Sequence, residues 1–98
     1  LEITDQRIAG PAVKLNPHAP IVAKAQGVLA RISHEPVAFH WEGGSVPIMA
    51  RLPQIAKAEP LMVGFGNEED NIHAPNESFS LEQFRQGFLF HGLFLGEV

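Results

Sequence analysis

The sequence predicts an α/β fold in which helices pack on a partial, largely parallel sheet. Two observations lead to this fold class. Segments rich in β-branched and apolar residues alternate with segments of helical apolar spacing, in the order strand, helix, strand, helix, strand, helix. Two of the predicted strands are almost entirely apolar, as in a sheet that is covered on both faces. The chain has 98 residues, which is at most one small domain.

Three elements are predicted in the N-terminal half. Residues 2–8 partly alternate apolar and polar side chains and predict a half-buried or edge strand. Residues 21–33 predict a helix, because their apolar side chains recur every three to four positions after a proline-containing start. Gly27 weakens this helix by up to ~1 kcal/mol, and therefore indicates a close neighbour at that point. Residues 37–41 predict a short strand.

Three further elements are predicted in the C-terminal half. Residues 46–52 predict a second, shorter helix, and residues 61–64 the third strand. The last helix is predicted over residues 81–95, where Ser80 and Gln83 fit a capping box. Its apolar side chains are spread too widely for a surface helix, so we expect it to pack on a sheet or on a partner.

Composition excludes several classes of protein. The 11 acidic and 7 basic residues give a formal net charge of −4, which leaves no basic footprint for nucleic acid. No apolar run is long enough to span a membrane, and no signal peptide is visible. The lack of cysteine removes thiolate metal sites and fits a reducing compartment. We therefore expect a cytoplasmic protein without nucleic-acid or membrane partners.

The chain also has features of a piece of a longer protein. It begins with Leu1 rather than methionine, and its first residues resemble the middle of a strand. A chain of this size has few elements with which to cover two apolar strands. We therefore expect either a fragment or a chain with an obligate partner.

The loop between the third strand and the last helix is the main candidate site. Open α/β sheets bind ligands beyond the carboxyl ends of their strands, and residues 64–77 occupy that place. His73 lies there among acidic residues that could orient its imidazole and raise its basicity as a metal ligand. The alternative interpretation is a surface histidine in an acidic loop. The other histidines lack a partner at ligand spacing, and we predict no chemical role for them: His18, His34, His40 and His91.

A second candidate is the turn Gly43-Gly44-Ser45, which precedes the second helix. Its backbone N–H groups have little steric cover and suit a carboxylate or phosphate oxygen, while Ser45 is also a plausible N-cap. The alternative interpretation is an ordinary tight turn. An unrelated anion-binding α/β module that uses this turn, without any role for His73, is a separate hypothesis.

Four segments occur in the order and spacing of one family: Gly10-Pro11-Ala12, residues 42–48, Gly64-Phe65-Gly66 and residues 70–77. Together they resemble the carboxy-terminal part of the di-zinc metallopeptidases. That family includes carnosinase-like dipeptidases, carboxypeptidase G, aminoacylases and succinyl-diaminopimelate desuccinylase. The form Gly-Gly-Ser-Val-Pro-Ile is closer to the dipeptidase branch than to the deacylases.

The resemblance implies a domain organisation and an activity. Residues 1–9 would be the last strand of a lid or dimerisation domain, and residues 10–98 the carboxy-terminal part of the catalytic domain. The full-length protein would be a homodimeric metallopeptidase that hydrolyses dipeptides or N-acyl amino acids through a metal-bound water. This chain would be inactive alone, with no catalytic residue of its own and the general base upstream. The alternative is a non-catalytic fragment or subunit that acts through protein–protein association.

The resemblance also implies roles for individual residues. His73 would complete one of two zinc sites, with cobalt or manganese as other possible metals. Asp70 or Glu77 would orient this imidazole or hold its loop closed. Gly44 and Ser45 would bind the carboxylate end of the substrate. A catalytic zinc needs about three protein ligands, so the other ligands are expected from the N-terminal half of the same protein.

Overall fold

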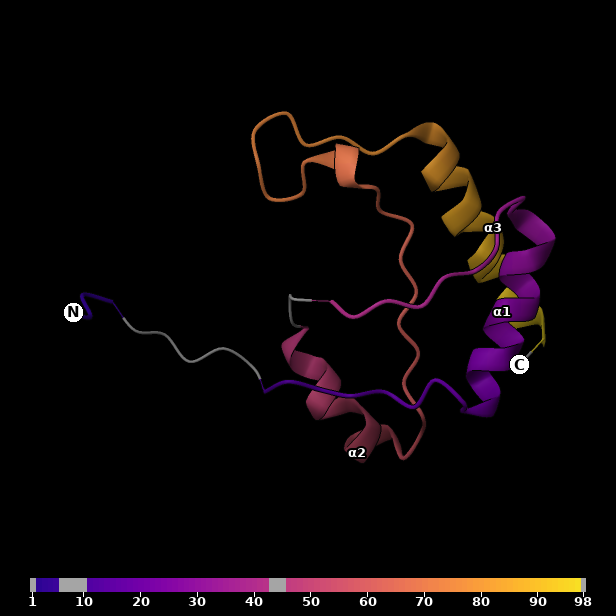
Figure 1. The fold of residues 1–98 in the computed structure, drawn as a ribbon. Coiled ribbons are helices and arrows are strands. Elements are labelled where there is room, and N and C mark those ends of the chain that lie inside the picture. The colour runs from indigo at the N-terminus through magenta and orange to yellow at the C-terminus, as the bar shows by residue number, and fades with distance from the viewer. Residues whose placement is uncertain (1, 6–10, 43–45, 98) are drawn as a thin grey trace.

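The structure, a computed structural model, describes residues 2–5, 11–42 and 46–97. Its helices are, in chain order, α1 (Pro20–Ile32), the 3₁₀ helix η1 (Pro47–Ala50), α2 (Leu52–Ala56), the 3₁₀ helix η2 (Glu68–Asp70) and α3 (Leu81–Glu97) (Figure 1). The described residues form no β-strand. The predicted α/β fold with a parallel sheet is therefore wrong, and the described fold is helical.

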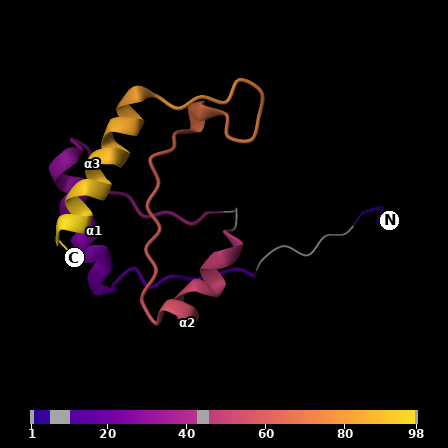
Figure 2. The same ribbon diagram turned by 180° about the vertical axis from the view of Figure 1, so that it is seen from behind.

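Two of the predicted strands are extended segments without strand partners. Residues 37–42 and 61–67 run through the middle of the molecule as extended chain (Figures 1 and 2). Within the described ranges, no backbone hydrogen bond joins these two segments, and a sheet requires such a ladder. Residues 2–5 of the first predicted strand are not in a β-strand, and residues 6–8 lie outside the described residues.

The extended segment 61–67 nevertheless has one covered face. Leu61, Val63 and Phe65 are half-buried and pack against the core, whereas Met62 and Gly64 between them are exposed. This period of two is the burial pattern of a strand with one covered face, whereas the apolar run at 61–63 predicted a strand covered on both faces. The pattern reports which side chains are covered. It does not report whether the backbone finds a hydrogen-bonding partner.

The core lies where α1 packs against α3, side by side in both views (Figures 1 and 2). Ala25 and Val28 of α1 and Phe90 of α3 are buried at its centre. The Phe90 ring lies 5.9 Å from the Phe65 ring and 5.3 Å from the Phe94 ring, measured between centroids. This aromatic cluster joins α3 to the extended segment that leads into the candidate loop.

The predicted helices are confirmed with changes at their ends. The first helix is α1, which begins with Pro20 at its first position, and the last is α3, which continues to Glu97. The second predicted helix is divided into η1 and α2. No described helix has both the length and the apolar character needed to cross a membrane.

Two expectations about packing have different outcomes. A Cβ placed on Gly27 would meet no atom within 4 Å, so the close neighbour predicted there is wrong. The last helix, expected to pack on a sheet or on a partner, packs instead on the helix α1 of the same chain through Phe90. Leu93 and Phe94 also pack against the core, whereas four other apolar side chains of α3 stay exposed: Leu81, Phe84, Phe88 and Leu95.

Candidate functional site

The loop that carries His73 connects η2 to α3 and extends away from the α1–α3 pair (Figure 1). The N–H of Ser78 donates to the carbonyl oxygen of Asp70 at 2.8 Å, which closes residues 71–77 into a loop. Asn71, His73 and Asn76 all have left-handed backbone conformations, with φ of 53°, 60° and 62°. Asparagine and histidine adopt this conformation more readily than most residues do, so the sequence suits the tight course of the loop.

His73 lies exposed within this closed loop. A left-handed conformation costs a non-glycine residue about 1–2 kcal/mol, and such residues cluster at functional sites. Its imidazole has no hydrogen-bond or ion-pair partner among the residues that the structure describes. Both ring nitrogens can therefore reach a ligand from outside the described chain.

The two acidic residues predicted beside His73 take different positions. Asp70 is half-buried at the base of the loop, where its Oδ2 accepts the N–H of Asn67 at 2.9 Å. Its side chain thus contacts backbone at the loop entry. Glu77 is exposed in the loop, and within the described ranges its carboxylate has no hydrogen bond or ion pair.

The base of the loop contains one residue whose role the sequence did not reveal. Gln83 forms the predicted capping box with Ser80, since the Ser80 N–H donates to Gln83 Oε1 at 2.7 Å and the Gln83 N–H to Ser80 Oγ at 3.0 Å. Gln83 Nε2 also donates to the carbonyl oxygen of Phe65 at 2.8 Å and to Asp70 Oδ2 at 2.7 Å. The glutamine at this capping position was the available signal, but its partners 13 and 18 residues away were not predictable from spacing.

The second candidate site lies mostly outside the described residues. Gly43, Gly44 and Ser45 are not described, so the predicted anion-binding turn has no geometry here. The residues just before it are exposed: His40 Nδ1 lies 3.3 Å from Glu42 Oε1, and Lys14 Nζ lies 5.9 Å from the centroid of the Trp41 ring.

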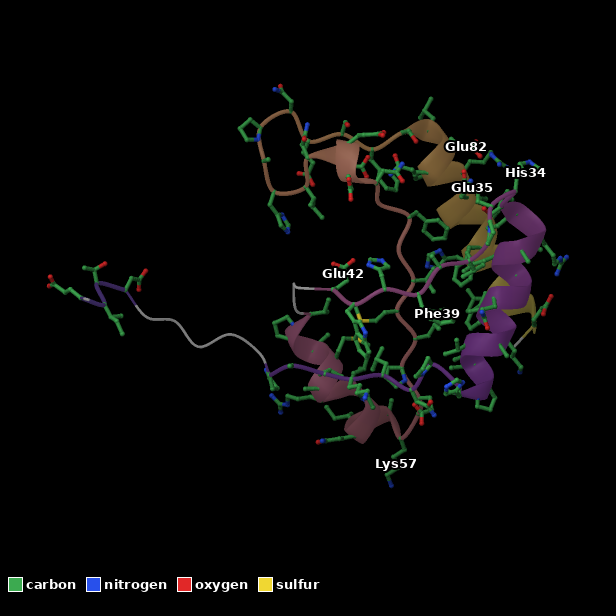
Figure 3. All side chains as sticks on the ribbon, viewed as in Figure 1. His34, Glu35, Phe39, Glu42, Lys57 and Glu82 are labelled. Atoms are coloured by element: carbon green, nitrogen blue, oxygen red, sulfur yellow. The ribbon has the colours of Figure 1, made fainter. Side chains whose placement is uncertain are left out.

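The charges at the start of α3 are paired with one another. Arg85 donates to Glu82 at 2.6 and 2.8 Å, and these hydrogen bonds lower the pKa of the Glu82 carboxyl below its usual value. The nearby His34 also lowers this pKa (Figure 3). The same carboxylate raises the pKa of Arg85. This pair stabilises the exposed side of α3 and makes no contact with the loop.

The described side chains can be examined for their ability to bind a metal ion. The described residues hold no group of three or more His, Cys, Asp or Glu side chains that could bind one. A catalytic metal requires about three protein ligands, and His73 offers one on an anchored loop. The described part of the chain therefore fits the role of supplying one ligand to a shared site. It does not fit a self-contained metal centre.

Comparison with known protein families decides the class of the chain. The family model described as peptidase family M20/M25/M40 matches residues 1–97. The chain belongs to this family. Members of peptidase family M20/M25/M40 are metallopeptidases, which typically use metal ions. No curated protein and no solved structure gives a significant match to the chain.

Membership in the M20/M25/M40 family confirms part of the sequence-based resemblance. The peptidase class is confirmed at the level of the family. Family membership also argues against the hypothesis of an unrelated anion-binding module. His73 is exposed on the loop between η2 and α3, and a neutral imidazole is one of the groups that bind zinc in proteins.

Proposed function

We propose that this chain is the carboxy-terminal part of a di-zinc peptidase that cleaves dipeptides or N-acyl amino acids. One observation carries the proposal. His73 presents an imidazole without a protein partner among the described residues, on a loop that hydrogen bonds close at its base. Family membership supplies the peptidase class. We place the protein in the cytoplasm, as a homodimer whose remaining metal ligands and general base come from its N-terminal half.

Each candidate residue has a part in this proposal. His73 donates a lone pair of its neutral imidazole to one zinc ion, and Asp70 holds the base of the loop. Glu77, four residues further along the loop, orients the imidazole when the site is assembled. Gly44 and Ser45 bind the carboxylate of the substrate through backbone N–H groups and a hydroxyl. When bound, the zinc ions polarise the scissile carbonyl and lower the pKa of water.

Removal of the imidazole tests this proposal. In the full-length protein, His73→Ala is expected to lose about one of two bound zinc ions and nearly all turnover, because a site with one ligand fewer binds zinc weakly. The matched control is His18→Ala, which removes another exposed histidine at the start of α1. The zinc content of both variants is measured by mass spectrometry, and His18→Ala is expected to keep both zinc ions. Unchanged zinc content and turnover in His73→Ala would contradict the proposal.

A second candidate function is association without catalysis. The exposed apolar side chains of α3 favour it, since Phe84 and Phe88 are 64% and 71% exposed. Both candidate functions require that the 98-residue chain alone is not a complete metal site, and zinc titration of the chain tests this requirement. A chain that supplies one ligand binds zinc weakly, so tight binding of one equivalent would show that the site is complete without another segment.

A further inference from the structure

We propose that Gln83 is the positioning residue of the His73 loop. The inference rests on the proposed role of His73 as a metal ligand and adds a side chain on α3 to it. Gln83 is 5% exposed, which makes it the one buried polar residue in the described part of the chain. Its Oε1 accepts the N–H of Ser80, and its Nε2 donates to Phe65 and Asp70.

These bonds join the two ends of the loop through a single side chain. Phe65 and Asp70 precede the loop, whereas Ser80 follows it. Asp70 extends the connection, because its carboxylate accepts the N–H of Asn67 and its carbonyl oxygen accepts the N–H of Ser78. The entry, the exit and the closing bond of the loop are thereby fixed to the first turn of α3. Movement of any one of them requires the others to move or a bond to break.

The chemistry of this position requires an amide. A glutamine side chain offers two N–H donors and a carbonyl acceptor. Here Nε2 donates two hydrogen bonds and Oε1 accepts one. Glutamate could not donate and would bring a second negative charge next to Asp70. Methionine would fill the same space without any of the bonds. The side chain therefore does more than cap α3, since the cap needs only its Oε1 and the backbone N–H of Gln83, both bonded to Ser80.

The main experiment compares two glutamines on the same helix. In the full-length protein, Gln83→Met is expected to weaken zinc affinity about 10–100-fold, the usual effect of losing a residue that orients a ligand. Gln86→Met is the matched control, because among the described residues Gln86 bonds through its side chain only to Glu82, on the exposed side of α3. Zinc affinity is measured by competition with a chelator. Zinc binding by Gln83→Met within about twofold of the wild type would overturn the inference.

A second measurement needs no metal. Hydrogen exchange at the Ser78 amide reports the closing bond of the loop in the zinc-free protein. We expect Gln83→Met to speed this exchange at least ~10-fold, with exchange at Val28 in the core unchanged. Equal exchange at Ser78 in wild type and variant would overturn the inference, whatever the metal does.

Asp70→Ala separates loop positioning from helix capping. It leaves the bonds between Ser80 and Gln83 intact but removes the acceptor through which Gln83 reaches the loop. We expect Asp70→Ala to weaken zinc affinity as Gln83→Met does, and the double variant to lose less than the product of the two effects. Independent effects would contradict a shared network. Loss of zinc in His73→Ala together with normal zinc in Gln83→Met would refute this inference alone, whereas normal zinc in His73→Ala would refute the proposed function.

Discussion

Truncation of Phe90 is expected to remove a large part of the stability of the 98-residue chain. The Phe90 side chain is 4% exposed and contacts Phe65 and Phe94 through ring pairs. Phenylalanine-to-alanine changes in cores cost about 3–5 kcal/mol, including the ring pairs and the cavity left behind. A domain of this size has about 5–15 kcal/mol of stability in total. With an m-value of about 2 kcal/mol/M, a loss of about 4 kcal/mol lowers the urea midpoint by about 2 M.

Phe88→Ala provides the matched control for this prediction. Phe88 lies on the same helix two positions earlier, but its side chain is 71% exposed. Its truncation is expected to cost less than about 1 kcal/mol, which moves the urea midpoint by less than about 0.5 M. Circular dichroism at increasing urea concentration measures both midpoints. Equal shifts for Phe88→Ala and Phe90→Ala would refute the placement of the core between α1 and α3.

Three smaller effects follow from the backbone and the surface. Gly27→Ala is expected to raise the free energy of unfolding by about 0.5–1 kcal/mol, because the added methyl group meets open space in α1; a lower urea midpoint would contradict this. Lys57→Gly is expected to raise it by about 0.5–1 kcal/mol, since Lys57 ends α2 at φ 52°, and an unchanged thermal midpoint would argue against that strain. The lowered pKa of Glu82 predicts that its pairing with Arg85 stabilises the fold above the usual carboxyl pKa of 4.5, and that this contribution is lost as the pH falls through the lowered value. Urea midpoints of wild type and Glu82→Gln should therefore converge in acid, and a gap that widens there would refute the pairing.

The helices were predictable because their signals are local. Apolar spacing located α1 and α3, and the Ser80–Gln83 pair located the start of α3 to the residue. The strands were not predictable in the same way. The apolar run correctly marked Leu61 and Val63 as covered, but Met62 in the same run is exposed. Strand formation also depends on a second segment at hydrogen-bonding distance. Helical glycine gave a false signal at Gly27, because the residue type alone does not say whether a neighbour is present.

The candidate site was predictable in part for the same reason. An acidic loop between an apolar run and a helix indicated that His73 would be accessible, and it is exposed. Its left-handed backbone and the closing bond between Asp70 and Ser78 depend on the full course of the loop. The bonds of Gln83 to Phe65 and Asp70 join distant parts of the chain, and no spacing rule predicts such contacts.

The most direct test of the account is a crystal structure of the full-length protein with zinc, with anomalous scattering recorded at the zinc edge. The account predicts a zinc peak ~2.0–2.1 Å from an imidazole nitrogen of His73, with the other ligands contributed by the N-terminal half. A pair of zinc ions with complete coordination and the His73 ring elsewhere would contradict it.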